Sequence, residues 1–255
     1  MHFYRKTESG VVPYHFVSMT SRPEELRPTR VSDVKKLWKA GETVYPSVTT
    51  VQNVLAKPAL NNWYVEQYLK QVWKSAMEEG AWETMEDWIS EIKRLTELEL
   101  DKAPSAGTDF HASLEAYFSG KLATTHPDYP LCEKVFEVIA DKTGLKSTQD
   151  WVTERLFMGD GYGGMIDLSC PTWIVDFKTK QTADKFKPGK MVYPEHSMQL
   201  AAYRKGLVRP FAKAANCFIC LEDGQIDFHE HPEKDLQKGL ALFEHCLKIW
   251  QIQNE

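Results

Sequence analysis

The sequence predicts a mixed α/β fold, in which a mainly helical region precedes a core built on a central mixed β-sheet flanked by helices. Apolar residues repeat with helical spacing up to Gly144, and from Thr148 the repeat changes to the alternation of strands. The 255 residues are 42% hydrophobic and 26% charged, as in globular proteins that bury a sizeable core. We expect a helical region over residues 1–103, packed on a core over residues 104–255.

Capping residues and prolines predict the helix boundaries of the first half. Ser47 is a suitable N-cap, and Pro58 ends the segment that follows it. Pro104 begins a separate helix whose apolar stripe runs up to the stop signal at Gly120. The expected helices cover residues 48–57, 59–77, 85–100, 104–119 and 127–141.

The second half predicts three consecutive strands, a helix, two strands and a final helix. The strands are recognised by alternation of apolar and polar residues, and the last helix by its amphipathic spacing. The expected strands lie around residues 152–156, 165–169, 173–178, 216–222 and 225–230, and the helices around 195–207 and 233–251.

The hairpin of the second and third strands concentrates charged residues. Asp167 on one strand, and Asp176 and Lys178 on the other, project to one face. A short turn over residues 169–172 is expected to place Asp167 opposite Ile174, so that Asp167 and Asp176 become diagonal neighbours about 7–8 Å apart. Two such carboxylates can hold one divalent cation, which offsets the cost of burying them. A solvated surface hairpin is the bland alternative.

Several short motifs follow one another along residues 46–63 and 107–203. They are Gly107-Thr108-x-x-His111, Glu154 before Gly161, Gly163 and Gly164, then Gly164-x-x-Asp167, Asp176-Phe177-Lys178-Thr179, and Gln199-Leu200-x-x-Tyr203. With these motifs in this order, the sequence resembles the PD-(D/E)xK nucleases. It is most similar to their RecB-type exonuclease branch, which includes phage exonucleases and mitochondrial genome maintenance exonucleases. The resemblance implies a restriction-endonuclease-like core.

The resemblance also implies a function and a set of site residues. The function is metal-dependent exonuclease cleavage of DNA ends, in phage or prophage DNA replication, recombination or repair. The implied ligands of Mg²⁺ or Mn²⁺ are His111, Asp167, Asp176 and the Phe177 carbonyl. The implied catalytic residues are Asp167, Asp176, Lys178, Glu154, Gln199 and Tyr203, with Lys178 orienting or deprotonating the attacking water.

Bland explanations remain open for single members of this set. His111 alone is more often a partly exposed helix histidine, and Tyr203 can be a core residue. Glu154 can bind the metal directly, support a ligand or pair with a lysine. At the level of function, a structure-selective endonuclease and a non-catalytic DNA-end-binding or assembly protein are the alternatives.

The partners expected are single- or double-stranded DNA ends, and a recombination or replication protein, but no membrane. The net charge is −5, yet residues 176–213 hold nine Lys and Arg against three acids. The lysines expected to meet DNA phosphates are Lys180, Lys185, Lys187 and Lys190. A loop whose lysines are merely solvated is the alternative.

The cysteines predict a reducing compartment. Five cysteines are too few and odd in number for a disulfide scaffold, and the first ten residues lack an apolar leader, so a cytoplasmic location is expected. The resemblance to phage exonucleases implies the cytoplasm of a bacterial host cell. Some RecB-type relatives hold an iron–sulfur cluster with one cysteine before the core, but Cys132 is the first here, and we expect no cluster. Cys217 and Cys220, with the nearby histidines, have the composition of a zinc site. Their segment reads as a strand, in which residues three apart face opposite sides, so a zinc site is not favoured.

Overall fold

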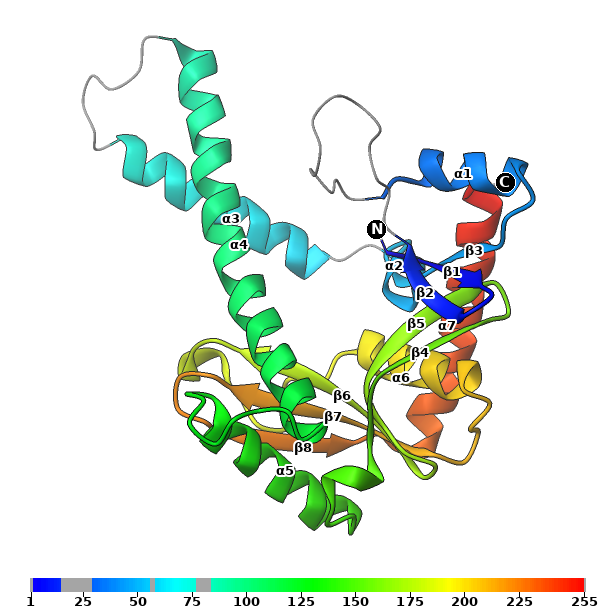
Figure 1. Cartoon of the computed structure of the whole chain (residues 1–255). Helices are drawn as coiled ribbons and strands as arrows, with labels where there is room; N and C mark the ends of the chain where they lie inside the picture. The colour runs from blue at the N-terminus through cyan, green and yellow to red at the C-terminus, as the bar shows by residue number, and fades with distance from the viewer. Residues whose placement is uncertain (1, 15–28, 56–57, 77–83, 255) are drawn as a thin grey trace. The chain divides into compact units, whose positions relative to one another are not determined.

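The computed structural model of the chain describes residues 2–14, 29–55, 58–76 and 84–254 (Figure 1). The chain forms two compact units, one of residues Met1–Leu55 with His111–Glu255 and one of residues Ala56–Phe110. The expected division between residues 103 and 104 stays a prediction; α4 (Met85–Phe118) runs through that position without a break.

A five-stranded mixed sheet forms the centre of the larger unit, which confirms the predicted α/β fold class. The strands, in their order across the sheet, are β4 (Val152–Gly159), β5 (Tyr162–Ser169), β6 (Trp173–Lys180), β7 (Lys213–Cys220) and β8 (Ile226–Glu230). Neighbours are antiparallel except β6 and β7, which are parallel. A parallel pair needs a crossover, and α6 (Pro194–Gly206) provides it.

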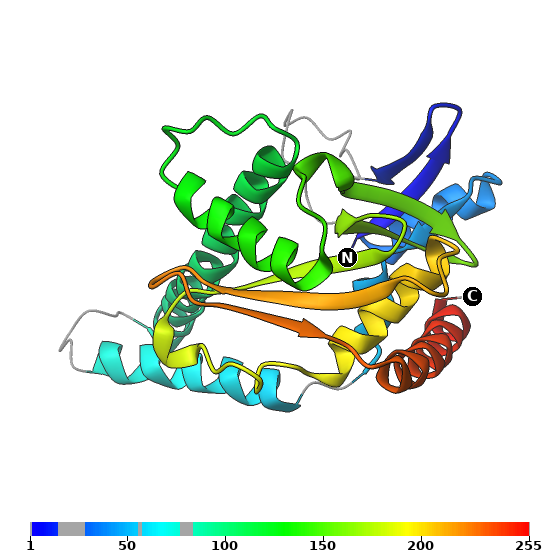
Figure 2. The same cartoon turned by 90° about the horizontal axis from the view of Figure 1, so that it is seen from below.

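Helices cover both faces of this sheet. Helices α6 and α7 (Glu233–Asn254) lie on one face, and α5 (Tyr129–Thr143) lies on the other (Figures 1 and 2). The apolar core between sheet and helices includes Ile166, Ile174, Leu200 and Phe243. The order βββαββα after Thr148 is therefore as predicted, and α5 ends at Gly144 in the left-handed conformation, as its position suggested.

The N-terminal part of this unit corrects the expectation of a mainly helical first half. It contains a three-stranded antiparallel sheet, with the order β2 (Gly10–Tyr14), β1 (Phe3–Thr7) and β3 (Val44–Pro46), and two short helices, α1 (Val31–Lys39) and α2 (Val48–Gln52). Pro13 inside the edge strand β2 hides the strand pattern, because proline is usual only at sheet edges. A bridge between Ser47 and Gly163 joins this region to β5.

Ser47 caps α2 as predicted, since its Oγ accepts a hydrogen bond of 3.0 Å from the backbone N–H of Thr50. The smaller unit contains α3 (Pro58–Ala76) and most of α4. The two helices expected over 85–100 and 104–119 are one continuous helix, so Pro104 does not end it. A 3-10 turn, η1 (Thr148–Asp150), precedes β4. None of the described helices combines the length and apolar character needed to cross a membrane.

Candidate active site

Four polar residues occupy matching positions on neighbouring strands of the central sheet. Leu168 pairs with Val175 and Ser169 with Ile174, so the next positions outward on β5 and β6 are Asp167 and Asp176. Asp176 pairs with Asn216 on β7, and Asn216 pairs with His229 on β8. These residues, together with Lys178 beyond Asp176 on β6, are called the polar row below.

The predicted register of the hairpin was wrong by two residues. We expected Asp167 opposite Ile174, whereas Ser169 takes that place and Asp167 comes level with Asp176. A shift of two residues keeps every side chain on its face, because side chains alternate with a period of two. The two acids are therefore closer in register than the predicted diagonal arrangement.

Strands β5 and β6 stop pairing just before the two acids. Their ladder contains only the pairs Leu168–Val175 and Ser169–Ile174. Beyond it, the backbone N–H of Phe177 donates a hydrogen bond of 2.7 Å to Oδ2 of Asp167. The Asp167 side chain thus takes the place of a backbone acceptor, and this holds its carboxylate at the opening between the strands.

Asp176 begins a hydrogen-bonded chain that contains most of the predicted catalytic residues. Its side chain is buried, with 2% of the residue exposed, and its Oδ2 lies 2.7 Å from Nζ of Lys178. Nζ also donates to Oε1 of Gln199 at 3.1 Å, and Nε2 of Gln199 donates to the Tyr203 hydroxyl at 2.8 Å. Gln199 and Tyr203 lie one turn apart on α6, so one helix face positions both.

On its other side, Asp176 is held by two residues that the sequence analysis did not select. Nδ2 of Asn216 donates to Oδ2 of Asp176 at 2.7 Å, and Oδ1 of Asn216 lies 2.7 Å from Nε2 of His231. Asn216 is fully buried and His231 nearly so. The sequence carries no signal for this pair, because the parallel register of β6 and β7 that joins Asn216 to Asp176 depends on the crossover.

His111 approaches the polar row from α4. Its Nδ1 lies 3.8 Å from Oδ2 of Asp167, and its ring meets the Phe177 ring edge to face at 6.0 Å. The pKa of His111 is lowered by burial, with Asp176 opposing this shift and Lys178 adding to it. Near neutral pH the ring is then uncharged, which is the form that binds a metal. The side chain of Thr108, in the same motif, lies outside those that the structure describes.

The two acids and Lys178 change one another's pKa values through their charges. Burial, and then the charge of Asp176, raise the pKa of Asp167 well above its usual range. Burial alone would lower the pKa of Lys178, but the charge and hydrogen bond of Asp176, with the charge of Asp167, outweigh burial and raise it. Lys178 is therefore an ammonium group, and it balances one of the two neighbouring carboxylates.

Glu154 lies near this centre in an unusual backbone conformation. It has φ of 47°, between the ladder pairs Thr153–Leu168 and Arg155–Ile166, and this places it across from Asp167. Burial, and next the charge of Glu115, raise the pKa of Glu154 to about 7. Glu115 was not among the residues predicted from the sequence, although it stands four residues after His111 and so one turn along the same helix.

Tyr4 is a further residue near the acids that the sequence analysis missed. Its ring packs on Gly163, where a Cβ atom would lie 2.9 Å from Cδ2 of Tyr4. Burial, and then the charges of Glu154 and Asp167, raise its pKa to about 12. Its strand is more than 140 residues before these acids in the sequence, so no local pattern could indicate it.

The two acids offer carboxylate oxygens, the type of ligand that hard divalent cations prefer. Among the residues the structure describes, no group of three or more His, Cys, Asp or Glu side chains is arranged to hold a metal ion, and this includes Cys217 and Cys220. The carboxylates of Asp167 and Asp176 nevertheless repel each other at a buried position, and a cation is what relieves such repulsion. The ligand set of His111, Asp167, Asp176 and Phe177 stays a prediction.

The lysine-rich loop after β6 is anchored to the sheet. Phe186 and Met191 are buried against β7, and η2 (Ala183–Lys185) begins with an N–H that donates to Glu222 at 2.7 Å. The pKa of Lys180 is lowered by burial, then by Lys178 and Lys185, so Lys180 is a neighbour of both of these cations. Lys185, Lys187 and Lys190 are exposed.

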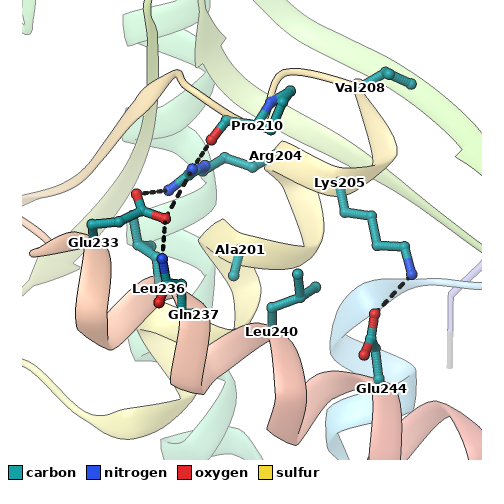
Figure 3. A pocket seen from close by; sticks show the side chains of 10 residues that line it. All are labelled: Ala201, Arg204, Lys205, Val208, Pro210, Glu233, Leu236, Gln237, Leu240 and Glu244. Atoms are coloured by element: carbon teal, nitrogen blue, oxygen red, sulfur yellow. Dashed lines mark hydrogen bonds and ion pairs between the residues drawn. The ribbon is translucent and has the colours of Figure 1, made fainter.

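A pocket of about 420 Å³ lies between α6 and α7 (Figure 3). Its lining contains no residue of the polar row. Two ion pairs cross from one helix to the other here, Arg204 with Glu233 at 2.7 Å and Lys205 with Glu244 at 2.8 Å. These contacts fasten α6, the helix that presents Gln199 and Tyr203, to α7.

Comparisons with known proteins show only distant likeness. No protein-family model matches the sequence, and no curated protein matches it either. A crystal structure from Eubacterium rectale, described as a candidate exonuclease, is similar at 16% identity and a TM-score of 0.38, over 53% of this chain and 62% of that one. The structure of a protein named SSO0001 is similar at 15% identity and a TM-score of 0.27, over 46% of this chain and 59% of that one. The chain thus spans about three fifths of each, and likeness at this level carries no argument about activity.

Proposed function

We propose that the chain is a metal-dependent deoxyribonuclease that hydrolyses phosphodiester bonds from DNA ends. One observation carries the proposal: Asp167, Asp176 and Lys178 are held together where β5 and β6 separate. Asp176 is buried and the other two are partly buried, and grouping two carboxylates and an ammonium group in this way costs stability, so apolar residues would often serve a purely structural role better. The order of the motifs that resemble RecB-type exonucleases supports the same function.

The chemistry of the substrate explains this choice of residues. A phosphodiester is anionic and repels a nucleophile, so cleavage requires positive charge at the phosphate and an activated water. Mg²⁺ or Mn²⁺ held by Asp167, Asp176, His111 and the Phe177 carbonyl would supply a Lewis acid and lower the pKa of the water.

The chain's own groups supply the remaining functions. Lys178, kept charged by Asp176, donates a hydrogen bond to the phosphate and balances developing negative charge. A charged ammonium group is better suited to this role than to deprotonating water. Gln199 orients the ammonium group through Oε1, and the Tyr203 hydroxyl orients Gln199. Glu154 titrates near neutral pH, so its carboxylate is suited to accept a proton there.

Substrate binding is assigned to the loop after β6. Lys180 and Lys185 extend the positive charge of Lys178 outward, and Lys187 and Lys190 continue it on the exposed part of the loop. Lysines arranged in this way bind phosphates without reading the base sequence. The proposed partner is therefore DNA of any sequence that presents an end.

End-labelled single-stranded and duplex DNA, beside a closed circle, test the proposal in Mg²⁺, in Mn²⁺ and in a chelator. We expect metal-dependent loss of the linear molecules while the circle persists. Lys178→Met should abolish cleavage, and Lys142→Met, at an exposed lysine of α5, serves as the matched control. Cutting of the circle would favour the endonuclease alternative. Binding without cleavage would favour a DNA-end-binding protein, and neither binding nor cleavage would overturn the proposal.

A further inference from the structure

An exposed aromatic ring lies at the junction of the lysine-rich loop and α6. Tyr193 directly precedes this helix, and 51% of the residue is exposed. Met191, two residues earlier, is buried against β7, and Pro194 begins the helix. The backbone is therefore restrained on both sides of a ring that is half open to solvent.

The Tyr193 ring is supported from beneath by two further rings. It meets the His196 ring at 5.5 Å and 68°, and the His196 ring meets that of Phe218 at 5.6 Å. The backbone N–H of Tyr193 donates to Nδ1 of His196 at 3.2 Å, and the N–H of His196 donates to the Tyr193 carbonyl at 3.0 Å. These contacts hold the three rings in place, with Tyr193 exposed, His196 partly buried and Phe218 in the core; the three rings are called the platform below.

This platform lies beside the candidate active site, because Phe218 on β7, its innermost ring, pairs with Lys178 on β6. The pKa of His196 is lowered to about 4, first by burial and next by the charge of Lys178, with Asp176 acting in the opposite direction. Both charged groups are thus close enough to act on the ring that supports Tyr193. The Nδ1 atom accepts a hydrogen bond, so the ring is neutral and does not repel the neighbouring lysines.

We propose that Tyr193 is a stacking platform for an unpaired base of a single-stranded DNA end, adjacent to the nucleotide whose phosphate meets Lys178. The inference rests on the proposed nuclease function and names its substrate class. Every base has a π-face, so stacking of this kind tolerates any sequence. Inside a duplex both faces of a base are already covered by its neighbours, and the one open face at a blunt end belongs to a base held in a pair, so an unpaired base is freer to turn onto the ring.

The charges nearby fit the same ligand. Lys180 is a neighbour of both Lys178 and Lys185, so a strand whose phosphates follow these cations keeps its bases free to reach an exposed ring. An aromatic ring on a cationic path is the combination that proteins use for single strands. Lysines alone would bind duplex and single strand alike.

Equilibrium binding tests whether the chain binds a single strand through the Tyr193 ring or binds DNA through its lysines alone. The full chain is titrated in Ca²⁺, without Mg²⁺ or Mn²⁺, against a fluorescent single-stranded oligonucleotide, a blunt duplex and the same strand with abasic residues near its end. Tyr193→Ala should weaken binding of the single strand by about 5- to 150-fold, as expected for loss of one stacked base. Tyr193→Phe should retain affinity within about twofold, because stacking needs the ring and not the hydroxyl.

The controls make each outcome decisive. Phe211, of which 96% is exposed, lies after the other end of α6, and Phe211→Ala should leave single-strand binding unchanged. Binding of the blunt duplex and of the abasic strand should differ little between Tyr193→Ala and wild type. The inference would be overturned if wild type and Tyr193→Ala bound the intact single strand with equal affinity. It would also be overturned if Tyr193→Ala lost as much affinity for the blunt duplex as for the single strand. A wild-type chain that binds the single strand but cleaves nothing would overturn the nuclease and leave the platform standing.

Discussion

Replacing Asn216 by alanine tests whether the buried amide orients Asp176. Asn216 is 0% exposed and bonds to Asp176 and His231 at 2.7 Å each. In the variant, Lys178 is the remaining side-chain partner of the Asp176 carboxylate among the hydrogen bonds described. The buried His231 ring loses its contact with the Asn216 oxygen. A stability cost and a catalytic cost should therefore appear together.

The size of both costs follows from these two bonds. A buried polar group that loses its partner costs about 1–3 kcal/mol, so two such groups and the space left by the amide cost about 3–5 kcal/mol in the free energy of unfolding. That is a large share of a typical stability of about 5–15 kcal/mol. Partners that orient a metal-binding carboxylate are typically worth about 10- to 100-fold in activity, and we expect this fall mainly in kcat.

Urea unfolding in a chelator and steady-state cleavage of end-labelled DNA measure the two costs. Cys217→Ala is the matched control, because Cys217 is the next residue on β7, equally buried, and should affect stability but not kcat. A double-mutant cycle of Asn216→Ala with His231→Ala should give a coupling energy of about 1–2 kcal/mol. Additive effects within about 0.5 kcal/mol, or unchanged kcat in Asn216→Ala, would refute the reasoning.

Three other outcomes are expected. Lys178→Met should abolish cleavage while binding in Ca²⁺ persists, because other lysines hold the phosphates; loss of binding in gel-shift assays would contradict this role. Glu154 has a pKa of about 7 against an ordinary 4.5, so its burial destabilises the wild type as pH rises through this window. In chelator, the free energy of unfolding of Glu154→Gln should therefore equal that of wild type near pH 4. At pH 8 it should be higher by about 1–2 kcal/mol, after allowance for solvent screening. Equal urea midpoints of the two proteins at both pH values would contradict this prediction. Replacing Lys185 and Lys187 by serine should reduce the log–log salt slope of DNA binding by about one to two, and an unchanged slope would mean that these lysines are only solvated.

The second half of the fold could be predicted because its signals are local. Alternation marks the strands around Asp167 and Asp176, and helical spacing marks α6, so Gln199 and Tyr203 could be placed on one helix face. The hydrogen bonds from Lys178 to Gln199 and from Gln199 to Tyr203 agree with that placement.

The N-terminal sheet could not be predicted because its pairing is not local. Strands β1 and β3 are separated by 36 residues, and each is five residues long or shorter. Tyr4 reaches the acids only because β1 packs beside β5, which no spacing in the sequence encodes. The continuous α4 shows the opposite limit, since Pro104, a residue type that often marks a helix boundary, lies inside the helix.

The hairpin shows that the face on which a side chain lies and the residue to which it stands opposite are determined by different features of the sequence. Alternation determines which side chains share a face, and it is unchanged by a shift of two residues, so Asp167, Asp176 and Lys178 were grouped correctly with the wrong pairing. Level determines how strongly the two carboxylates repel each other, because repulsion depends on distance. With Asp167 level with Asp176, the like charges are nearest neighbours on adjacent strands, and one ammonium group balances only one of them. The excess negative charge at the opening of the strands is therefore a property of the register, and it is the physical basis of the proposal that a cation binds here.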